Sequence, residues 1–179
     1  MSNKYIFSGS DDQSFNVWDI EDVFQITLVK SLKFAHYGMI SFFSEFYDNK
    51  YIFTGGYDSC LKTWNIENIN SIQCEAENKS NGPLTCCSNI FSEHFLITAD
   101  LHGMVILWNI VNIQNILSFP NKQFLDYTIF SLSKVLDGMY FLACGRASDI
   151  ELWHIEENQT FEYCMKYSVE NSCYCIKSY

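Results

Sequence analysis

The stretch "YIFTGGYDSCLKTWNI" at residues 51–66 joins an apolar run, two glycines, an aspartate and a tryptophan. A second version, "YIFSGSDDQSFNVWDI" at residues 5–20, is identical to it at seven of sixteen positions. Two further versions are "FLITADLHGMVILWNI" at residues 95–110 and "YFLACGRASDIELWHI" at residues 140–155. The four tryptophans of the chain therefore recur every 44 to 46 residues, and such a period indicates stacked structural units.

Each unit has the pattern of a small antiparallel sheet. "YIFTGG" and "LKTWNI" are short and rich in β-branched and aromatic residues, and the turn of Tyr, Asp, Ser and Cys between them predicts a hairpin. A third apolar run precedes the hairpin at residues 39–46, 84–91 and 128–136, and a fourth follows the tryptophan, as at 24–34 and 161–169. Four antiparallel strands in such a period are typical of one propeller blade. We therefore predict an all-β fold of about four blades in a single domain over residues 1–179.

Composition sets further limits on the protein. Residues 1–12, "MSNKYIFSGSDD", lack the charged start and long apolar segment of a secretory signal, so we expect an intracellular protein of the cytoplasm or nucleus with its eight cysteines reduced. No apolar stretch is long enough to predict a transmembrane helix. The formal net charge is −10 and Arg146 is the only arginine, which argues against direct binding of nucleic acid.

The sequence contains no recognisable catalytic constellation. It has no G-x-S-x-G, H-E-x-x-H, Walker-type or G-x-G-x-x-G motif, and no cysteine or histidine pair has the spacing of zinc ligands. The adjacent Asp11 and Asp12 fit a turn better than an acid–base pair. We therefore expect no enzymatic activity, no metal and no cofactor.

The repeat resembles the WD40 family. Trp18-Asp19 matches the dipeptide that gives the family its name, and the later repeats carry Trp-Asn twice and Trp-His once. The resemblance implies a hydrogen-bonded network in each blade, made of the tryptophan, an aspartate six residues earlier, a serine or threonine ten residues earlier, and a histidine before the inner strand. The positions that match this pattern are Ser8, Asp12, Trp18, His36, Thr54, Asp58, Trp64, Thr98, Trp108 and Trp153.

The matches to this network are unequal among the four repeats. Only the second has every member, namely His36, Thr54, Asp58 and Trp64. The third has His102 where the family has aspartate, and the fourth has alanine at both of the other hairpin positions. Because a buried polar network stabilises a fold only when its members are satisfied, we expect order to decrease toward the fourth repeat.

The number of repeats predicts an unfinished ring. Rings of this family usually contain about seven or eight blades, so four blades would have to turn about twice as far as usual to close. In family strand order, the chain opens at the second strand of one blade, and "NSCYCIKSY" at residues 171–179 resembles the inner strand of another. We expect an open arc that belongs to a longer propeller, or to a composite ring completed by a second chain, including a second copy.

The resemblance also implies a surface for partners, on the face where the loops entering each blade meet the hairpin turns. Aromatic and arginine side chains are the usual anchors of such interfaces, which favours Tyr37, Tyr57 and Arg146. The alternative, that these are ordinary loop residues, stays open. The candidates on this face are Asp11, Tyr37, Met39, Tyr57, Leu101 and Arg146.

Two functions follow from the resemblance. The leading prediction is a non-catalytic protein-interaction scaffold in an intracellular complex. The alternative is the WD-repeat subunit of a box C/D small nucleolar ribonucleoprotein, acting in pre-rRNA processing and small ribosomal subunit biogenesis. Residues 54–66, 90–108 and 129–153 resemble that subunit, whereas the acidic charge counts against it.

Overall fold

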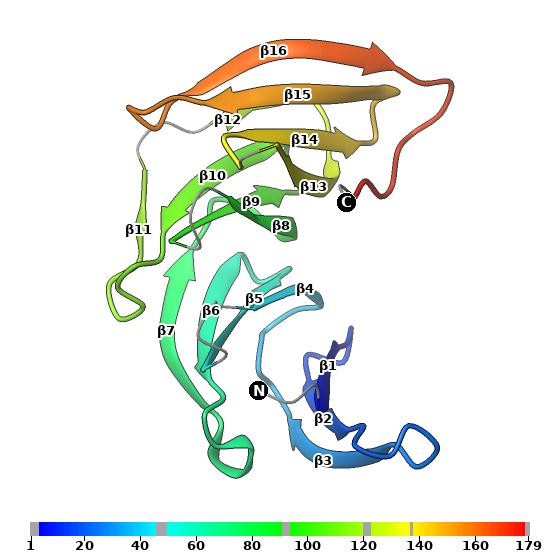
Figure 1. Cartoon of the computed structure of the whole chain (residues 1–179), viewed down its shortest axis with the longest axis vertical. Coiled ribbons are helices and arrows are strands. Elements are labelled where there is room, and N and C mark those ends of the chain that lie inside the picture. Colours follow the sequence, from blue (N-terminus) through cyan, green and yellow to red (C-terminus); the bar gives the residue numbers. More distant parts are fainter. Residues whose placement is uncertain (1–3, 46–49, 91–93, 120–122, 137, 178–179) are drawn as a thin grey trace.

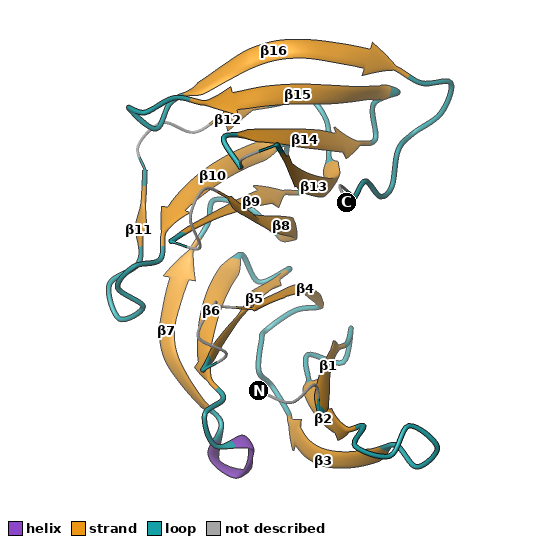
Figure 2. Cartoon of the chain, in the orientation of Figure 1, coloured by secondary structure: helices purple, strands orange, loops and turns teal. Residues whose placement is uncertain are grey.

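In a computed structural model, the chain forms four antiparallel sheets that follow one another along an open arc (Figure 1). The structure describes residues 4–45, 50–90, 94–119, 123–136 and 138–177. Within these residues the only helical segment is one 3-10 turn, and the other regular elements are strands (Figure 2). The all-β fold of about four propeller blades that the repeat predicts is confirmed.

Each sheet is built from strands that are consecutive in the sequence, so the blades occur in chain order. The first blade contains β1 (Tyr5–Gly9), β2 (Phe15–Asp19) and β3 (Thr27–Leu32). The second contains β4 (Ile40–Glu45), β5 (Tyr51–Gly56), β6 (Cys60–Asn65), η1 (Ile69–Ser71) and β7 (Gln73–Lys79). The third contains β8 (Leu84–Ile90), β9 (Phe95–Asp100), β10 (Met104–Asn109), β11 (Leu117–Ser118) and β12 (Gln123–Phe124). The fourth contains β13 (Ile129–Val135), β14 (Tyr140–Gly145), β15 (Asp149–Ile155) and β16 (Phe161–Ser168).

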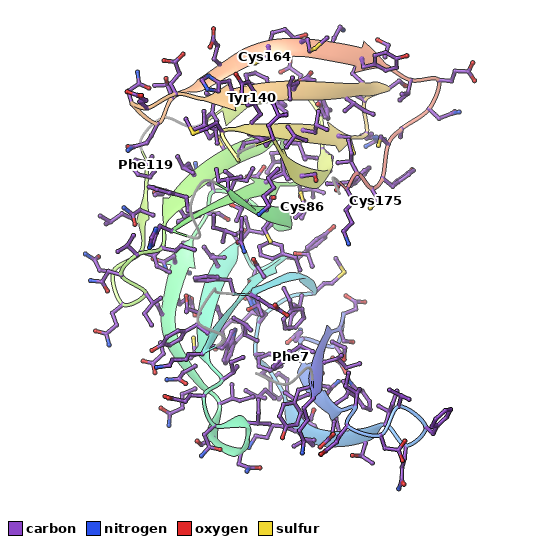
Figure 3. All side chains as sticks on the ribbon, viewed as in Figure 1. Phe7, Cys86, Phe119, Tyr140, Cys164 and Cys175 are labelled. Atoms are coloured by element: carbon purple, nitrogen blue, oxygen red, sulfur yellow. The ribbon has the colours of Figure 1, made fainter. Side chains whose placement is uncertain are left out.

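Apolar side chains on both faces of the interior blades hold the arc together. Successive residues of a strand point to opposite faces, so Ile97 of β9 joins the cluster shared with the fourth blade, whereas Leu96 joins the cluster shared with the second. Three such clusters fill the three spaces between blades, as the side chains in Figure 3 show. The tryptophan of each later blade faces the blade before it, and the Trp64 and Phe15 rings are 5.0 Å apart.

A bulge near the start of each inner strand links neighbouring blades. The register shifts at Ser41 in β4 and at Thr85 in β8. The Ser41 hydroxyl donates to the carbonyl oxygen of Leu84 at 2.6 Å, and the Thr85 hydroxyl donates to that of Ile129 at 2.7 Å. The bulge turns a side chain out of its own ladder and toward the next inner strand, which fixes the spacing of the blades.

Three details differ from a regular series of four-stranded blades. Among the described residues the first blade has three strands, with β1 at its inner edge. The outer strand of the third blade is divided into β11 and β12, both paired with β10, and the sequence places Pro120, which has no N–H, between them. The prediction of an inner strand at 171–179 is wrong for its described part, residues 171–177, because no second strand lies beside this segment to form a ladder.

Candidate functional site

The hairpin turns of the four blades and the segments that enter the blades meet at one end of the sheets. The N–H of Tyr57 donates to Met39 at 2.8 Å, that of Leu101 to Pro83 at 2.8 Å, and that of Arg146 to Thr128 at 2.9 Å. Further backbone bonds join each entering segment to the turn of the preceding blade, as from Ser80 to Ser59 and from Leu125 to Gly103. These segments form one continuous surface, here named the turn face and defined as residues 10–14, 33–39, 57–59, 80–83, 101–103, 125–128 and 146–148.

A chain of hydrogen bonds crosses the second blade beneath the turn face. The Trp64 indole N–H donates to Thr54 Oγ1 at 2.8 Å, and this hydroxyl lies 2.7 Å from His36 Nε2. Because an indole can only donate, the Thr54 oxygen accepts, and its proton is free to bond Nε2. The imidazole proton therefore lies on Nδ1, which donates to the Asp58 carboxylate at 2.9 Å. Burial lowers the pKa of His36, which favours this neutral ring.

Asp58 connects this buried chain to the loop above it. Its carboxylate also accepts from the backbone N–H of Tyr37 at 2.8 Å and of Cys60 at 3.2 Å. Burial opposes ionisation of Asp58, but the hydrogen bonds from His36 and from these two N–H groups lower its pKa. A Cβ at Gly38 would lie 3.0 Å from the Asp58 nitrogen, so the loop packs closely on the turn. The position of Tyr37 is thus set from inside the blade.

The other blades satisfy their tryptophans with fewer partners. Trp18 donates to Ser8 Oγ and Trp108 donates to Thr98 Oγ1, each at 2.8 Å. In the fourth blade, where the hydroxyl is missing, the Trp153 indole donates to Glu151 Oε2 at 3.0 Å. A carboxylate two residues away therefore takes the place of the serine or threonine.

Among the described residues, the turn aspartates of the first and third blades accept hydrogen bonds from their own turns alone. Asp12 accepts from the N–H of Ser14 at 3.0 Å and from its hydroxyl at 2.6 Å. In the third blade the sequence pattern points to position 102, but Asp100 accepts from the N–H groups of His102 and Met104, both at 2.9 Å. Sequence reasoning missed Asp100, although an aspartate at the end of a strand and before a glycine turn is a signal for such a cap.

The residue after each tryptophan has a separate structural role. The side-chain oxygens of Asp19, Asn65 and Asn109 each accept from the N–H two residues further on, at 2.8, 3.0 and 3.0 Å. Aspartate and asparagine both offer this Oδ1 acceptor, which explains why Asp follows the tryptophan in the first repeat and Asn follows it in the second and third. His154 instead packs against the Tyr140 ring at 4.6 Å and lies 3.6 Å from Glu162.

Three candidates for partner binding lie together on the turn face. Tyr37 and Tyr57 are 80% and 40% exposed, and the backbone bond from Tyr57 to Met39 holds their loops side by side. The Lys62 ammonium lies 5.7 Å from the centre of the Tyr37 ring and pairs with Glu77 at 3.1 Å. This corner, formed by Tyr37, Met39 and Tyr57 and here named the tyrosine corner, offers two aromatic surfaces, whereas the Lys62 beside them is buried and paired with Glu77.

Leu101 and Arg146 lie together at a second place on the turn face. Both line a recess of about 580 Å³ between the third and fourth blades. Arg146 is exposed, and Asp126 and Tyr127 also border the recess. Asp11 is exposed on the turn of the first blade, outside both places. The six candidates from the sequence thus form two groups and leave one residue apart. Tyr37, Met39 and Tyr57 lie at the tyrosine corner, Leu101 and Arg146 line the recess, and Asp11 lies outside both.

One group of potential metal ligands lies in the fourth blade. His154, Glu156 and Glu162 each offer a ligand atom, and these atoms lie within 4.8 Å of one another among the residues described. Glu162 is exposed and already pairs with His154. We assign no metal to this group.

Comparisons with known proteins give the family and the fold. A sequence model described as "WD domain, G-beta repeat" matches residues 2–19 and 27–65. A chain from a solved structure titled "Crystal Structure of Mitotic Checkpoint Complex" matches at a TM-score of 0.80 and 11% identity. The match covers 99% of this chain and 55% of that chain, so the protein spans about half of its length. No curated protein matches the sequence.

These comparisons confirm the resemblance to WD40 repeats that the sequence predicts. Residues 2–19 and 27–65 match the WD40 repeat model, and the described chain has the fold of β-propeller blades. Such repeats and such a fold support a role in binding other proteins. In the part of the chain that the structure describes, no helix is both long and apolar enough to cross a membrane.

Proposed function

We propose that this protein is a non-catalytic scaffold that binds other proteins through its turn face, within an intracellular complex of the cytoplasm or nucleus. The observation that carries the proposal is the tyrosine corner, where Tyr37 and Tyr57 are exposed on loops fixed from below by Asp58. Tyrosines anchor interfaces well because they contribute a large contact area with few rotatable bonds. Loops that are already ordered lose less entropy on binding.

The recess supplies a second contact for the same partner. Arg146 is exposed at its border and can donate hydrogen bonds to a carboxylate or a carbonyl group. The rest of the surface is acidic, since the formal net charge is −10. Long-range attraction therefore favours a partner whose own surface is basic around the contact.

A pair of double variants tests this function. Tyr57→Ala with Arg146→Ala removes one anchor from each place, whereas Glu67→Ala with Val111→Ala changes exposed loops at the opposite end of the sheets. That these loops lie opposite follows from the bonds of Ile66 to Lys50 and Ile110 to His94, which join the other ends of the strands. Each full chain is tagged, captured from native cells, and compared by quantitative mass spectrometry and RNA sequencing.

The first pair should reduce capture of the specific partners by about tenfold or more, because each anchor contributes roughly 1 kcal/mol or more. The melting temperature should stay the same for both pairs, and the control pair should capture the wild-type set. Equal capture by all three proteins would contradict the proposal. Enrichment of box C/D small nucleolar RNA would replace it with the ribonucleoprotein function.

We also propose that residues 1–179 act as a single WD40 domain. Each of the three apolar clusters includes residues from two neighbouring blades, so every blade shares its core with the next. The expected result is one cooperative transition in scanning calorimetry, and two separated transitions would contradict it.

A further inference from the structure

Residues 171–177, here named the returning segment, lie against the inner edge of the fourth blade. They follow the outer strand β16 and return to β13, where the Ile176 N–H donates to Ser131 Oγ at 3.1 Å (Figure 1). The Cys173 N–H donates to the carbonyl oxygen of Gly145 at 3.1 Å. These contacts place Cys173 beside the last residues of β14.

Two side chains approach closely at this point of the repeat. In the first blade the Ile40 N–H donates to the carbonyl oxygen of Ser10 at 3.2 Å, and a Cβ on Gly9 would lie 2.8 Å from the Cβ of Ile40. Cys144 occupies the repeat position of Gly9. Cys173 takes the place of Ile40, because its N–H bonds the residue after Cys144. The two cysteines are therefore near enough for a disulfide, which needs Cβ atoms about 3.5–4.5 Å apart.

The two thiols differ in their access to solvent. Cys144 is fully buried, whereas Cys173 is partly exposed, and both are free thiols in the structure. Burial raises the pKa of the Cys144 thiol, and its interaction with the Cys173 thiol raises this pKa further. Because a thiol reacts as its thiolate and must be reached from solution, an oxidant reacts with Cys173 before Cys144.

We propose that Cys144 and Cys173 form a redox-modification site, in which a peroxide joins them by a reversible disulfide. The Cys173 thiolate attacks one oxygen of hydrogen peroxide and breaks the O–O bond, which gives a sulfenic acid and hydroxide. The Cys144 thiol then attacks the sulfenic sulfur, and its proton leaves with the sulfenic hydroxyl as water. The hydroxide takes up the proton that Cys173 released, so two thiols lose two electrons and hydrogen peroxide becomes two molecules of water.

The disulfide ties the returning segment to the turn face. The Ser172 hydroxyl donates to the carbonyl oxygen of Arg146 at 2.9 Å, and Arg146 lines the recess. A covalent bond next to this contact fixes the border of the recess as well as the segment. Both cysteines and their contacts come from described residues of the fourth blade and the returning segment, so the bridge requires no other part of the protein and no partner.

Treatment of the reduced full chain with an equimolar amount of hydrogen peroxide provides the first test. Thiols are counted with a maleimide reagent after denaturation, and joined peptides are identified by mass spectrometry without reduction. The count should fall by two from eight, with one peptide pair joining Cys144 to Cys173, and dithiothreitol should restore it. Retention of all eight thiols, a bond between two chains, or a bridge from Cys173 to the exposed Cys175 would overturn the proposal.

Cysteine variants then separate this pair from the other thiols. Cys144→Ala is compatible with the fold, because Ala99 occupies the same repeat position in the third blade and is fully buried. In this variant Cys173 should remain a sulfenic acid after peroxide, so that dimedone labels it about tenfold more than in the wild type. Cys175→Ser and Cys164→Ser change exposed cysteines as matched controls and should still form the bridge. Equal labelling of Cys144→Ala and wild type, or loss of the bridge in a control, would contradict the assigned pair.

Hydrogen exchange followed by mass spectrometry measures what the bridge does to the returning segment. Peptides covering residues 171–177 should exchange about tenfold more slowly in the oxidised chain, because the segment can no longer leave β13 as a unit. The oxidised Cys164→Ser control should show the same slowing, and Cys144→Ala should show none. Equal exchange of the segment in the two redox states of the wild type would refute its fixing by the disulfide.

Discussion

Replacement of Thr54 by valine tests whether the buried hydrogen-bond chain stabilises the second blade. The substitution keeps the shape of the side chain and removes one hydroxyl. Thr54 and His36 are fully buried and Trp64 nearly so, which leaves no path for water to replace the lost atom. Two groups then lose their partner, the Trp64 indole N–H at 2.8 Å and the His36 Nε2 at 2.7 Å.

The expected cost follows from the number of buried groups left without a partner. Each such group raises the free energy of the folded state by about 1–3 kcal/mol, so with two groups Thr54→Val should lower the free energy of unfolding by roughly 2–6 kcal/mol. Thr98→Val is the matched control, because Thr98 is equally buried and, of the residues that the structure describes, accepts from Trp108 alone. It leaves one group unpaired and should cost about 1–3 kcal/mol. Ser8→Ala should cost less, about 0.5–1.5 kcal/mol, since Trp18 is only partly buried.

Urea unfolding followed by tryptophan fluorescence and far-ultraviolet circular dichroism measures the three costs. The order expected is Thr54→Val, then Thr98→Val, then Ser8→Ala, with similar slopes against urea for all proteins. A cost for Thr54→Val no greater than that for Thr98→Val would show that the bond to His36 contributes nothing. That result would refute the directional chain from Trp64 to Asp58.

Three further predictions concern pH, packing and the turn after the tryptophan. Burial lowers the pKa of His36 below its usual 6.5, so as the pH falls His36 is protonated in the unfolded chain before it is protonated in the folded one. The contribution of His36 to the free energy of unfolding is therefore full above about pH 6.5 and decreases below it. The melting temperature of His36→Gln should accordingly fall less between about pH 7 and 5 than that of the wild type. Gly145→Ala would place a Cβ 1.9 Å from the Thr128 carbonyl oxygen and should cost about 1–3 kcal/mol in urea unfolding. Gly82→Ala should cost less, because its Cβ would meet only side-chain atoms at longer distances, the His102 ring at 2.7 Å and Asp100 Oδ2 at 2.8 Å. Asn109→Asp keeps the acceptor for the Val111 N–H and should leave the melting temperature unchanged, whereas Asn109→Leu should cost about 1 kcal/mol; equal effects of the two changes would count against the turn.

The features that the sequence predicts well are those set by neighbouring residues. Alternating apolar residues with a glycine turn at fixed spacing specify a hairpin, and the repetition of that hairpin requires neighbours on both faces. The contacts of Thr54 with Trp64 and His36 were implied by the resemblance to the WD40 family. The structure gives their cause, because the ladder of β5 and β6 places Ile52 opposite Trp64 and so brings Thr54 near the indole.

Other features depend on contacts that spacing does not reveal. Asp100 caps the third turn from two residues before the expected position, since its carboxylate reaches the N–H of Met104, the repeat counterpart of the Cys60 N–H that Asp58 binds. Glu151 replaces a missing hydroxyl at Trp153 for the same reason. Residues 171–177 have the composition of a strand, but a strand also requires a partner edge, and only the folded arrangement shows that none lies beside them.

The orientation of the tryptophans has a consequence for protein synthesis. Trp64, Trp108 and Trp153 each pack on the blade that precedes them in the chain. As the chain leaves the ribosome, every new blade therefore meets an apolar surface that has already been made. Folding can advance from the N-terminus one blade at a time, and the strands awaiting a partner are always those translated last.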